Sequence, residues 1–182
     1  MKTRTLALLA ALCALASPAF AQSPAQPYAG QQGREIKALS AEDVAALLKG
    51  EGMGLAKAAE LNFYPGPAHV LALANELKLS EAQRRQVQAV FDRMHASAVS
   101  LGGEIVEQER ALDRQFAEGV IAADRLADAT AKIAALQGRL RAVHLSAHLE
   151  TRPLLGQEQL AAYRRLRGYD GGGRTHAHPH HG

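Results

Sequence analysis

Residues 80–118 read SEAQRRQVQAVFDRMHASAVSLGGEIVEQERALDRQFAE, the longest stretch of the chain with one continuous apolar pattern. Apolar residues recur in steps of four and three, with Gln108 in the single polar place, which is typical of the contact stripe of paired helices. Gly102-Gly103 lies within the stripe, and because each glycine costs a helix about 1 kcal/mol relative to alanine, we expect a bend there. The stripe consists of Val87, Phe91, Met94, Ala98, Leu101, Ile105, Leu112 and Phe116.

A second stretch with the same spacing runs from about residue 123 to Thr151 and is ended by Pro153. Two long amphipathic helices joined by a short turn predict an antiparallel hairpin. The second stripe consists of Leu126, Ala129, Ile133, Leu136, Leu140, Val143 and Ala147.

Shorter helices flank the hairpin. Ser40 is suited to cap a helix that Gly50 ends, and further short helices are predicted at 55–61, 67–78 and 157–167. No segment alternates apolar and polar residues as a half-buried strand would. The predicted fold class is therefore all-α: a bent antiparallel helical hairpin with short N-terminal helices and a C-terminal helix.

The N-terminus has the pattern of a secretory signal peptide. Met1-Lys2-Thr3-Arg4 is positively charged, residues 6–16 are apolar or small, and Ala19-Phe20-Ala21 matches the pattern that signal peptidase reads. The apolar run is too short to span a membrane, which takes about 20 residues. We therefore expect cleavage after Ala21 and a location in the periplasm.

Cleavage would change what the composition allows. Cys13 would be lost, leaving no thiol, disulfide or cysteine-based metal site. Loss of Lys2 and Arg4 would lower the 21 basic residues to 19 against 18 acidic ones, a balance that argues against nucleic-acid binding. The expected organisation is a signal peptide (1–21), a disordered leader (22–35), short N-terminal helices and a turn (36–66), a helical domain (67–169) and a flexible tail rich in glycine and histidine (170–182).

Two of the predicted helices start with the same motif. Leu79-Ser80-Glu81-Ala82-Gln83 is a capping box, and Leu155-Gly156-Gln157-Glu158-Gln159 repeats its spacing 76 residues later. The pair resembles the twice-repeated Leu-Thr-x-x-Gln signature of the Spy/CpxP family of periplasmic proteins, and the related heavy-metal sensor and zinc-resistance proteins are similar too. The resemblance covers residues 67–169, with Ser80 and Gly156 where the signature has threonine.

This resemblance implies a bent helical hairpin that forms a homodimeric cradle. It also implies one of two activities: holding unfolded client proteins without ATP, or signalling envelope and metal stress to the periplasmic domain of a sensor protein. Arginines spread along the long helices could attract acidic clients, although the neighbouring acidic residues favour solvated ion pairs. Residues 36–66 lie outside the resemblance and have no assigned role.

His144 and His148 are the sharpest candidates for chemistry. Residues four apart share one helix face, so both imidazoles can bind one ion, and imidazole suits zinc, copper, nickel and cobalt. His69 is the expected third ligand, because a hairpin can bring its helix beside the end of the second long helix. The pair also resembles the ligand pair of the heavy-metal sensors; alternatively, both histidines are half-buried residues flanking the stripe. Weaker candidate ligands are Glu76, Met94, His95 and Glu150.

The tail carries a second, compositional signal for metal binding. Its alternative interpretation is a disordered end without a role. Neutral imidazole is the form that binds metal, so binding at either place should weaken as pH falls below about 6.5. The tail histidines are His176, His178, His180 and His181.

Catalysis has little support in the sequence. The His144 pair lacks the glutamate of His-Glu-x-x-His, and Ser100 lies within a helix rather than on a nucleophile elbow, so we expect no enzyme. The sequence predicts a periplasmic metal-binding stress or resistance protein that senses or buffers a divalent transition metal. The alternatives are an ATP-independent chaperone or adaptor of an envelope-stress sensor, and a structural envelope protein without a ligand.

Overall fold

The computed structural model describes residues 26–171, so the expected signal peptide and nearly all of the expected tail lie outside the described residues. The chain divides into two compact units between Gln32 and Gly33. Of the first unit, residues 26–32 are described, and they form turns in which the Ala29 N–H donates to the Gln26 carbonyl at 3.0 Å. All of the helices below belong to the second unit.

Residues 33–171 fold into helices and turns without a β-strand, which confirms the predicted all-α class. Two 3₁₀ turns, η1 (Arg152–Leu154) and η2 (Tyr169–Gly171), flank the last helix. Among the described residues, no helix is long and apolar enough to cross a membrane. The α-helices are α1 (Ala41–Leu48), α2 (Lys57–Glu60), α3 (Pro67–Ala72), α4 (Glu81–Ala117), α5 (Ala123–Thr151) and α6 (Gln157–Leu166).

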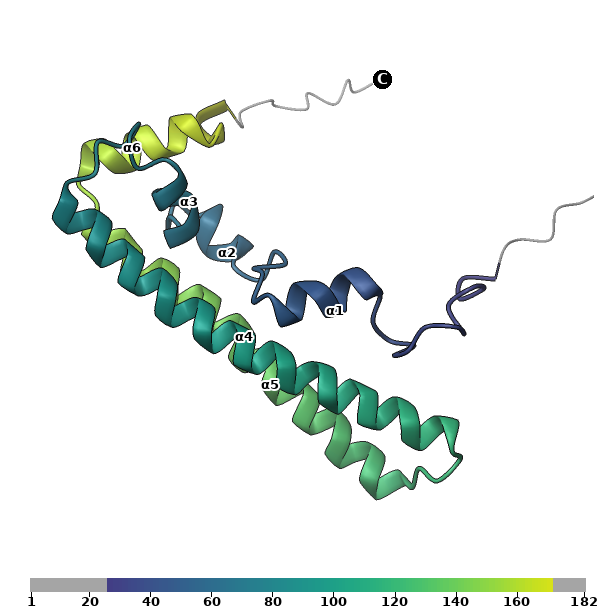
Figure 1. Ribbon diagram of the computed structural model, residues 1–182. Coiled ribbons are helices and arrows are strands. Elements are labelled where there is room, and N and C mark those ends of the chain that lie inside the picture. The colour runs from purple at the N-terminus through teal and green to yellow at the C-terminus, as the bar shows by residue number, and fades with distance from the viewer. Residues whose placement is uncertain (1–25, 172–182) are drawn as a thin grey trace, which may run out of the picture. The chain divides into compact units, whose positions relative to one another are not determined.

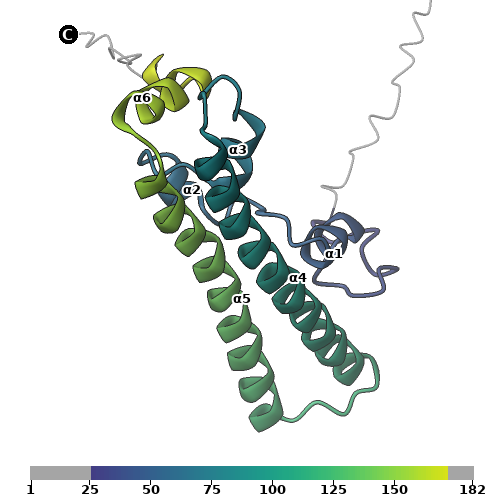
Figure 2. The ribbon, with the colours of Figure 1, turned by 60° about the vertical axis from the view of Figure 1, so that its left-hand side comes forward.

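Helices α4 and α5 form the predicted antiparallel hairpin and make the most extensive helix–helix contact of the second unit (Figures 1 and 2). The predicted bounds of α5 are confirmed, and α4 starts directly after its cap, Ser80. Residues of both predicted stripes are buried between the two helices. They include Ala98, Leu101 and Ile105 of α4 and Leu136 and Leu140 of α5. Dimerisation into a cradle stays a prediction.

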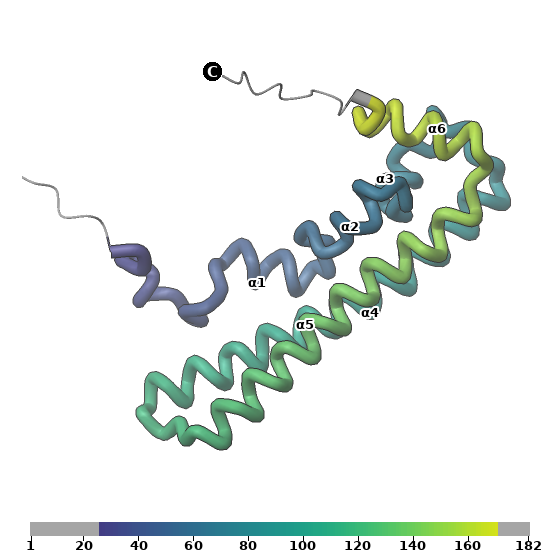
Figure 3. The backbone as a smooth tube through the Cα atoms, turned by 180° about the vertical axis from the view of Figure 1, so that it is seen from behind, coloured from purple at the N-terminus to yellow at the C-terminus, as the bar shows by residue number. Residues whose placement is uncertain are grey.

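Within the second unit, the short helices α1, α2 and α3 lie along one face of the hairpin (Figure 3). Helix α1 packs on α4, α2 packs on α5, and α3 contacts both. Two core clusters result: Ile36 and Leu47 join the middle of the hairpin, while Val70 of α3 and Tyr163 of α6 pack with Val87 at its end. Residues 36–66, without an assigned role from their sequence, therefore cover the hairpin.

Gly102 allows α1 to approach α4 closely. A methyl group built on Gly102 would lie 2.0 Å from the Leu47 carbonyl oxygen, whereas one on Gly103 would meet nothing within 4 Å. Helix α4 runs unbroken through both glycines, and the bend expected there stays a prediction. The first glycine serves a close approach of two backbones, which only a residue without Cβ permits.

The two repeated motifs meet each other in space. Each glutamine accepts the N–H of its own cap residue: Gln83 from Ser80 at 3.0 Å and Gln159 from Gly156 at 2.9 Å. The two side-chain amides also bond each other, with the Gln83 Nε2 donating to the Gln159 Oε1 at 2.8 Å. The repeated motif therefore fastens the start of α6 to the start of α4.

Two short helices are shorter than the sequence suggested. Helix α2 covers Lys57–Glu60 rather than 55–61, and α3 ends at Ala72 rather than near Lys78. Residues 73–78 form turns instead, and Lys78 ends them with a φ of 50°. This path buries Leu77, at 2% exposure, in the end cluster, so tertiary packing overrides the local helix preference.

Candidate functional site

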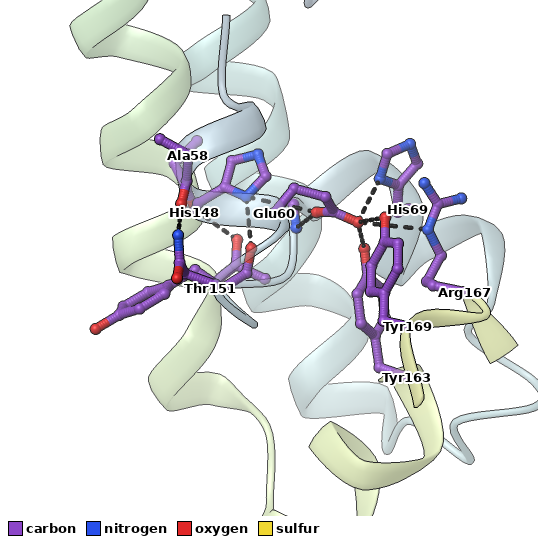
Figure 4. Close-up of polar contacts among 12 residues, drawn as sticks. Ala58, Glu60, His69, His148, Thr151, Tyr163, Arg167 and Tyr169 are labelled. Atoms are coloured by element: carbon purple, nitrogen blue, oxygen red, sulfur yellow. Dashed lines mark hydrogen bonds and ion pairs between the residues drawn. The ribbon is translucent and has the colours of Figure 1, made fainter. Parts of the chain in front are cut away.

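A buried carboxylate joins several elements at the end of the hairpin where α5 ends. Glu60 is the last residue of α2 and is 8% exposed. Its Oε1 accepts hydrogen bonds from the hydroxyls of Tyr163 at 2.5 Å and Tyr169 at 2.9 Å, and the Arg167 Nε lies 3.3 Å from the same oxygen. Figure 4 shows these three side chains converging on Glu60.

The same carboxylate reaches α3 and α5. The Gly66 N–H donates to Oε2 at 3.3 Å, and the His148 Nδ1 lies 3.7 Å from that oxygen. On the other oxygen, the His69 Nδ1 lies at 3.4 Å. Glu60 therefore connects the segment before α4 with both the end of α5 and the C-terminal helix.

The charge of Glu60 is strongly stabilised. Burial alone would raise the pKa of Glu60, because a carboxylate loses hydration, but the contacts from His69, Tyr163 and Tyr169 outweigh it and lower the pKa to about 2. Burial and the hydrogen bond to Glu60 raise the pKa of the Tyr163 hydroxyl. At neutral pH the carboxylate accepts and the tyrosine donates, which fixes the direction of the hydrogen bond.

One ring nitrogen of His148 is already hydrogen-bonded within the protein. Its Nδ1 lies 2.6 Å from the carbonyl oxygen of Tyr64, and because a carbonyl only accepts, Nδ1 carries the proton. The ring packs directly on Gly66, where an added methyl would lie 2.8 Å from Nε2. The Nε2 of neutral His148 is left as an acceptor, the arrangement in which metal-binding histidines are usually held.

His144 is buried, at 4% exposure, and its Nε2 has no hydrogen-bond partner. Burial lowers the pKa of His144, with a smaller contribution from the charge of His148. A buried nitrogen without a partner costs about 1–3 kcal/mol, so the fold retains His144 at an energetic cost.

One open cleft of about 720 Å³ gathers the metal-binding side chains of the described residues. It is bordered by the loop between α1 and α2, the start of α3, and parts of α4 and α5. Every histidine and every methionine within residues 26–171 lines it. These are Met53, His69, Met94, His95, His144 and His148.

The structure brings some of the predicted ligands together and separates others. His69, His144 and His148 border the cleft, as do the weaker candidates Met94 and His95. Glu150 instead binds Arg93 at 2.7 Å on the surface. Glu76 borders a different hollow, beside the start of α6.

The structure does not place these ligands as a formed metal site. Within residues 26–171, no three or more His, Cys, Asp or Glu side chains are arranged as a group that could hold a metal ion. The tail histidines, His176 to His181, lie outside the described residues.

The sequence did not identify the buried carboxylate and its hydroxyl partners, which are Glu60, Tyr163 and Tyr169. No local pattern marks them, because the carboxylate and its two hydroxyl partners are 103 and 109 residues apart. The available signal was an aromatic residue on the apolar side of the last helix, where Leu160 and Tyr163 lie one turn apart.

Comparisons with family models, curated proteins and solved structures find no match for this chain. The resemblance to the Spy/CpxP family therefore stays a sequence-based prediction. What the fold and the cleft define together is a class: an all-helical hairpin protein with a histidine-lined cleft at one end.

Proposed function

We propose that the protein binds a divalent transition metal ion in this cleft and senses or buffers that metal in the periplasm, without catalysing a reaction. The observation that carries the proposal is the gathering of all described histidines at one cleft, with the Nε2 of His144 buried and without a partner. His144 and His148 would supply two Nε2 ligands from one helix face, and His69 is the proposed third.

The surroundings of the histidines support this role. His148 donates its Nδ1 proton to a carbonyl, and His69 directs its Nδ1 toward Glu60. Oxygen acceptors on Nδ1 orient metal-binding imidazoles and raise their basicity. Coordination would also give the buried Nε2 of His144 the partner that it lacks.

His69 offers the adjustment that a three-ligand site needs. Its side chain is 46% exposed and it lies on α3, a helix of six residues. Its ring is exposed apart from the approach of Nδ1 to Glu60, whereas His144 and His148 are buried on α5. The pair therefore provides the fixed part of the proposed site and His69 the movable part.

The test is calorimetric titration of zinc, nickel, cobalt and copper(II) into a chain that lacks competing ligands. We call this the background chain: Cys13 and the histidines at 176, 178, 180 and 181 are replaced by alanine. We expect one tight site, which His144→Leu and His148→Leu abolish. Ser146→Ala, an exposed change on the same helix, is the matched control. Affinities no tighter than millimolar in the background chain would refute the proposal.

A second candidate function is a chaperone or adaptor that binds unfolded chains or a sensor domain. The observation that favours it is a set of large apolar side chains exposed on the second unit. They include Leu61 (59%), Phe116 (55%), Val120 (55%) and Leu149 (60%). This function predicts suppression of client aggregation that a chelator does not change. The proposed metal protein would instead respond to the chelator.

A further inference from the structure

Two thioethers border the same cleft as the histidines. Met53 comes from the loop between α1 and α2, and Met94 comes from α4 beside His95. No other methionine occurs within residues 26–171. Thioether sulfur is a soft ligand, which zinc, nickel and cobalt in their divalent states use far less than copper(I) does.

Met53 is not explained by packing. It is 45% exposed, and its backbone has a φ of 45°, which is uncommon for a residue with a side chain. Glycine would adopt this conformation without strain, and Gly52 and Gly54 stand on either side. Met53 shares a positive φ with Phe63 and Lys78, and what distinguishes it is an exposed thioether that borders the cleft, where it can act as a ligand.

The carboxylate best placed in the cleft is not free to bind a hard cation. Both oxygens of Glu60 are engaged: Oε1 by two tyrosine hydroxyls and Arg167, and Oε2 by the Gly66 N–H. Divalent zinc, nickel and cobalt sites often include such an oxygen. Apart from the exposed carboxylate of Glu51, the other metal-binding side chains of the cleft are imidazoles and thioethers, of which His95 already uses its Nε2 on the Lys49 carbonyl at 3.0 Å.

The charge of the cleft also favours an ion of low charge. Its border carries three cations, Lys49, Lys57 and Arg167, against the two carboxylates Glu51 and Glu60. With neutral histidines, the formal charge of the border is therefore positive. A monovalent ion meets half the Coulomb repulsion that a divalent ion meets at the same place.

We infer that the ion best matched to this cleft is a soft monovalent one, copper(I) or silver(I), bound by histidine nitrogens together with the thioethers of Met53 and Met94. This inference rests on the proposed metal-binding cleft and replaces the divalent ion named there by a monovalent one. In this inference, the glycine-flanked loop between α1 and α2 places the metal ligand Met53 at the border of the cleft. No change of oxidation state is part of the proposal.

Silver(I) is the probe, because it has the coordination preferences of copper(I) and does not oxidise in air. Silver(I) and zinc are titrated separately into the background chain in chloride-free buffer, and again with Met53→Leu and Met94→Leu combined. We expect silver(I) to bind more tightly than zinc, and the double variant to weaken silver(I) binding about tenfold or more while leaving zinc within about twofold. The ε-methyl NMR signals of both methionines should shift with one equivalent of silver(I).

Leu61→Ile is the matched control, a volume-conserving change at the border of the same cleft. It should leave silver(I) binding unchanged, and metal-free melting curves of all variants should coincide. Silver(I) binding of equal affinity with and without the two methionine substitutions would overturn the inference. Zinc binding without silver(I) binding would also overturn it. Both results leave the proposed function standing. If neither silver(I) nor any of zinc, nickel, cobalt and copper(II) binds more tightly than millimolar, the proposed function fails and the inference falls with it.

Discussion

The two ends of the hairpin differ in how they are packed. At the end where α4 starts and α5 ends, side chains from α2, α3 and α6 are buried against the hairpin. The carboxylate of Glu60 connects these elements through its hydrogen bonds and ion pairs. At the opposite end, no residue from 107 to 132 is buried. There the segment before α1 is held by surface ion pairs, Lys37 with Asp113 at 3.1 Å and Arg110 with Glu35 at 2.9 Å. Such exposed pairs contribute only about 0–1 kcal/mol each.

This difference shows that the two ends of one hairpin are held by different kinds of contact. A region with few buried apolar contacts opens locally at low free energy, whereas a packed and hydrogen-bonded region opens only with the whole fold. The end with the cleft is therefore expected to be rigid and the tip around Gly119 to be locally unstable. The proposed ligands all lie toward the rigid end or border its cleft.

The largest effect is expected from Glu60→Ala. The change leaves two buried hydroxyls and Arg167 without their acceptor, so we expect a loss of about 3–5 kcal/mol in the free energy of unfolding, measured by denaturant titration. Glu118→Ala, at the exposed end of α4, is the control and should change stability by less than about 0.5 kcal/mol. Equal losses in the two variants would remove the distinction between the ends.

The next largest effect is the pH dependence that Glu60 contributes. Its pKa in the fold is about 2, against a usual value of 4.5, so its contribution is complete above pH 4.5 and is lost as pH falls toward 2. That difference corresponds to about 3 kcal/mol. The measurement compares unfolding of the wild-type chain and Glu60→Gln between pH 6 and 2, expressed as the difference between the two. A difference that does not shrink toward low pH would contradict the assignment.

Between the two ends, the neighbouring glycines of α4 allow a matched pair of substitutions. Gly102→Ala places a methyl against the Leu47 carbonyl, so we expect a loss of about 1–3 kcal/mol as α1 shifts. Gly103→Ala meets nothing and should stabilise the helix by about 0.5–1 kcal/mol. Thermal unfolding of both variants tests the prediction, which opposite signs support and equal signs refute.

The smallest effect is expected at the tip. Phe116 is 55% exposed, so Phe116→Ala should change the free energy of unfolding by less than about 1 kcal/mol. Denaturant titration at two protein concentrations measures it. A larger loss that grows with protein concentration would show that the tip is covered in a dimer, and would make the tip a structured contact rather than an open end.

Much of the fold could be predicted from the sequence, because its elements depend on local rules. The apolar spacing of 123–151 and the capping residue Ser80 place both long helices correctly. The ends of α2 and α3 were not predicted correctly, because packing on α4 and α5 decides where these two helices end. Leu77, for example, is buried in a turn rather than in a continuing helix.

The candidate site was predictable only in part. The spacing of His144 and His148 is visible in the sequence, and His69 borders the same cleft as proposed. Neither the burial of the pair nor the partners of Glu60 could be predicted, because the face of α5 that carries the histidines is covered by residues 36–66. The proposed role of Met53 could not be predicted either, because only the fold places this residue at the border of the cleft.

The distances along the chain between Glu60 and its partners also have a consequence for biosynthesis. Tyr163 and Tyr169 are made 103 and 109 residues after Glu60, so a nascent chain that lacks its last helix holds a carboxylate with no hydroxyl partners. The cleft end can close only when synthesis is almost complete.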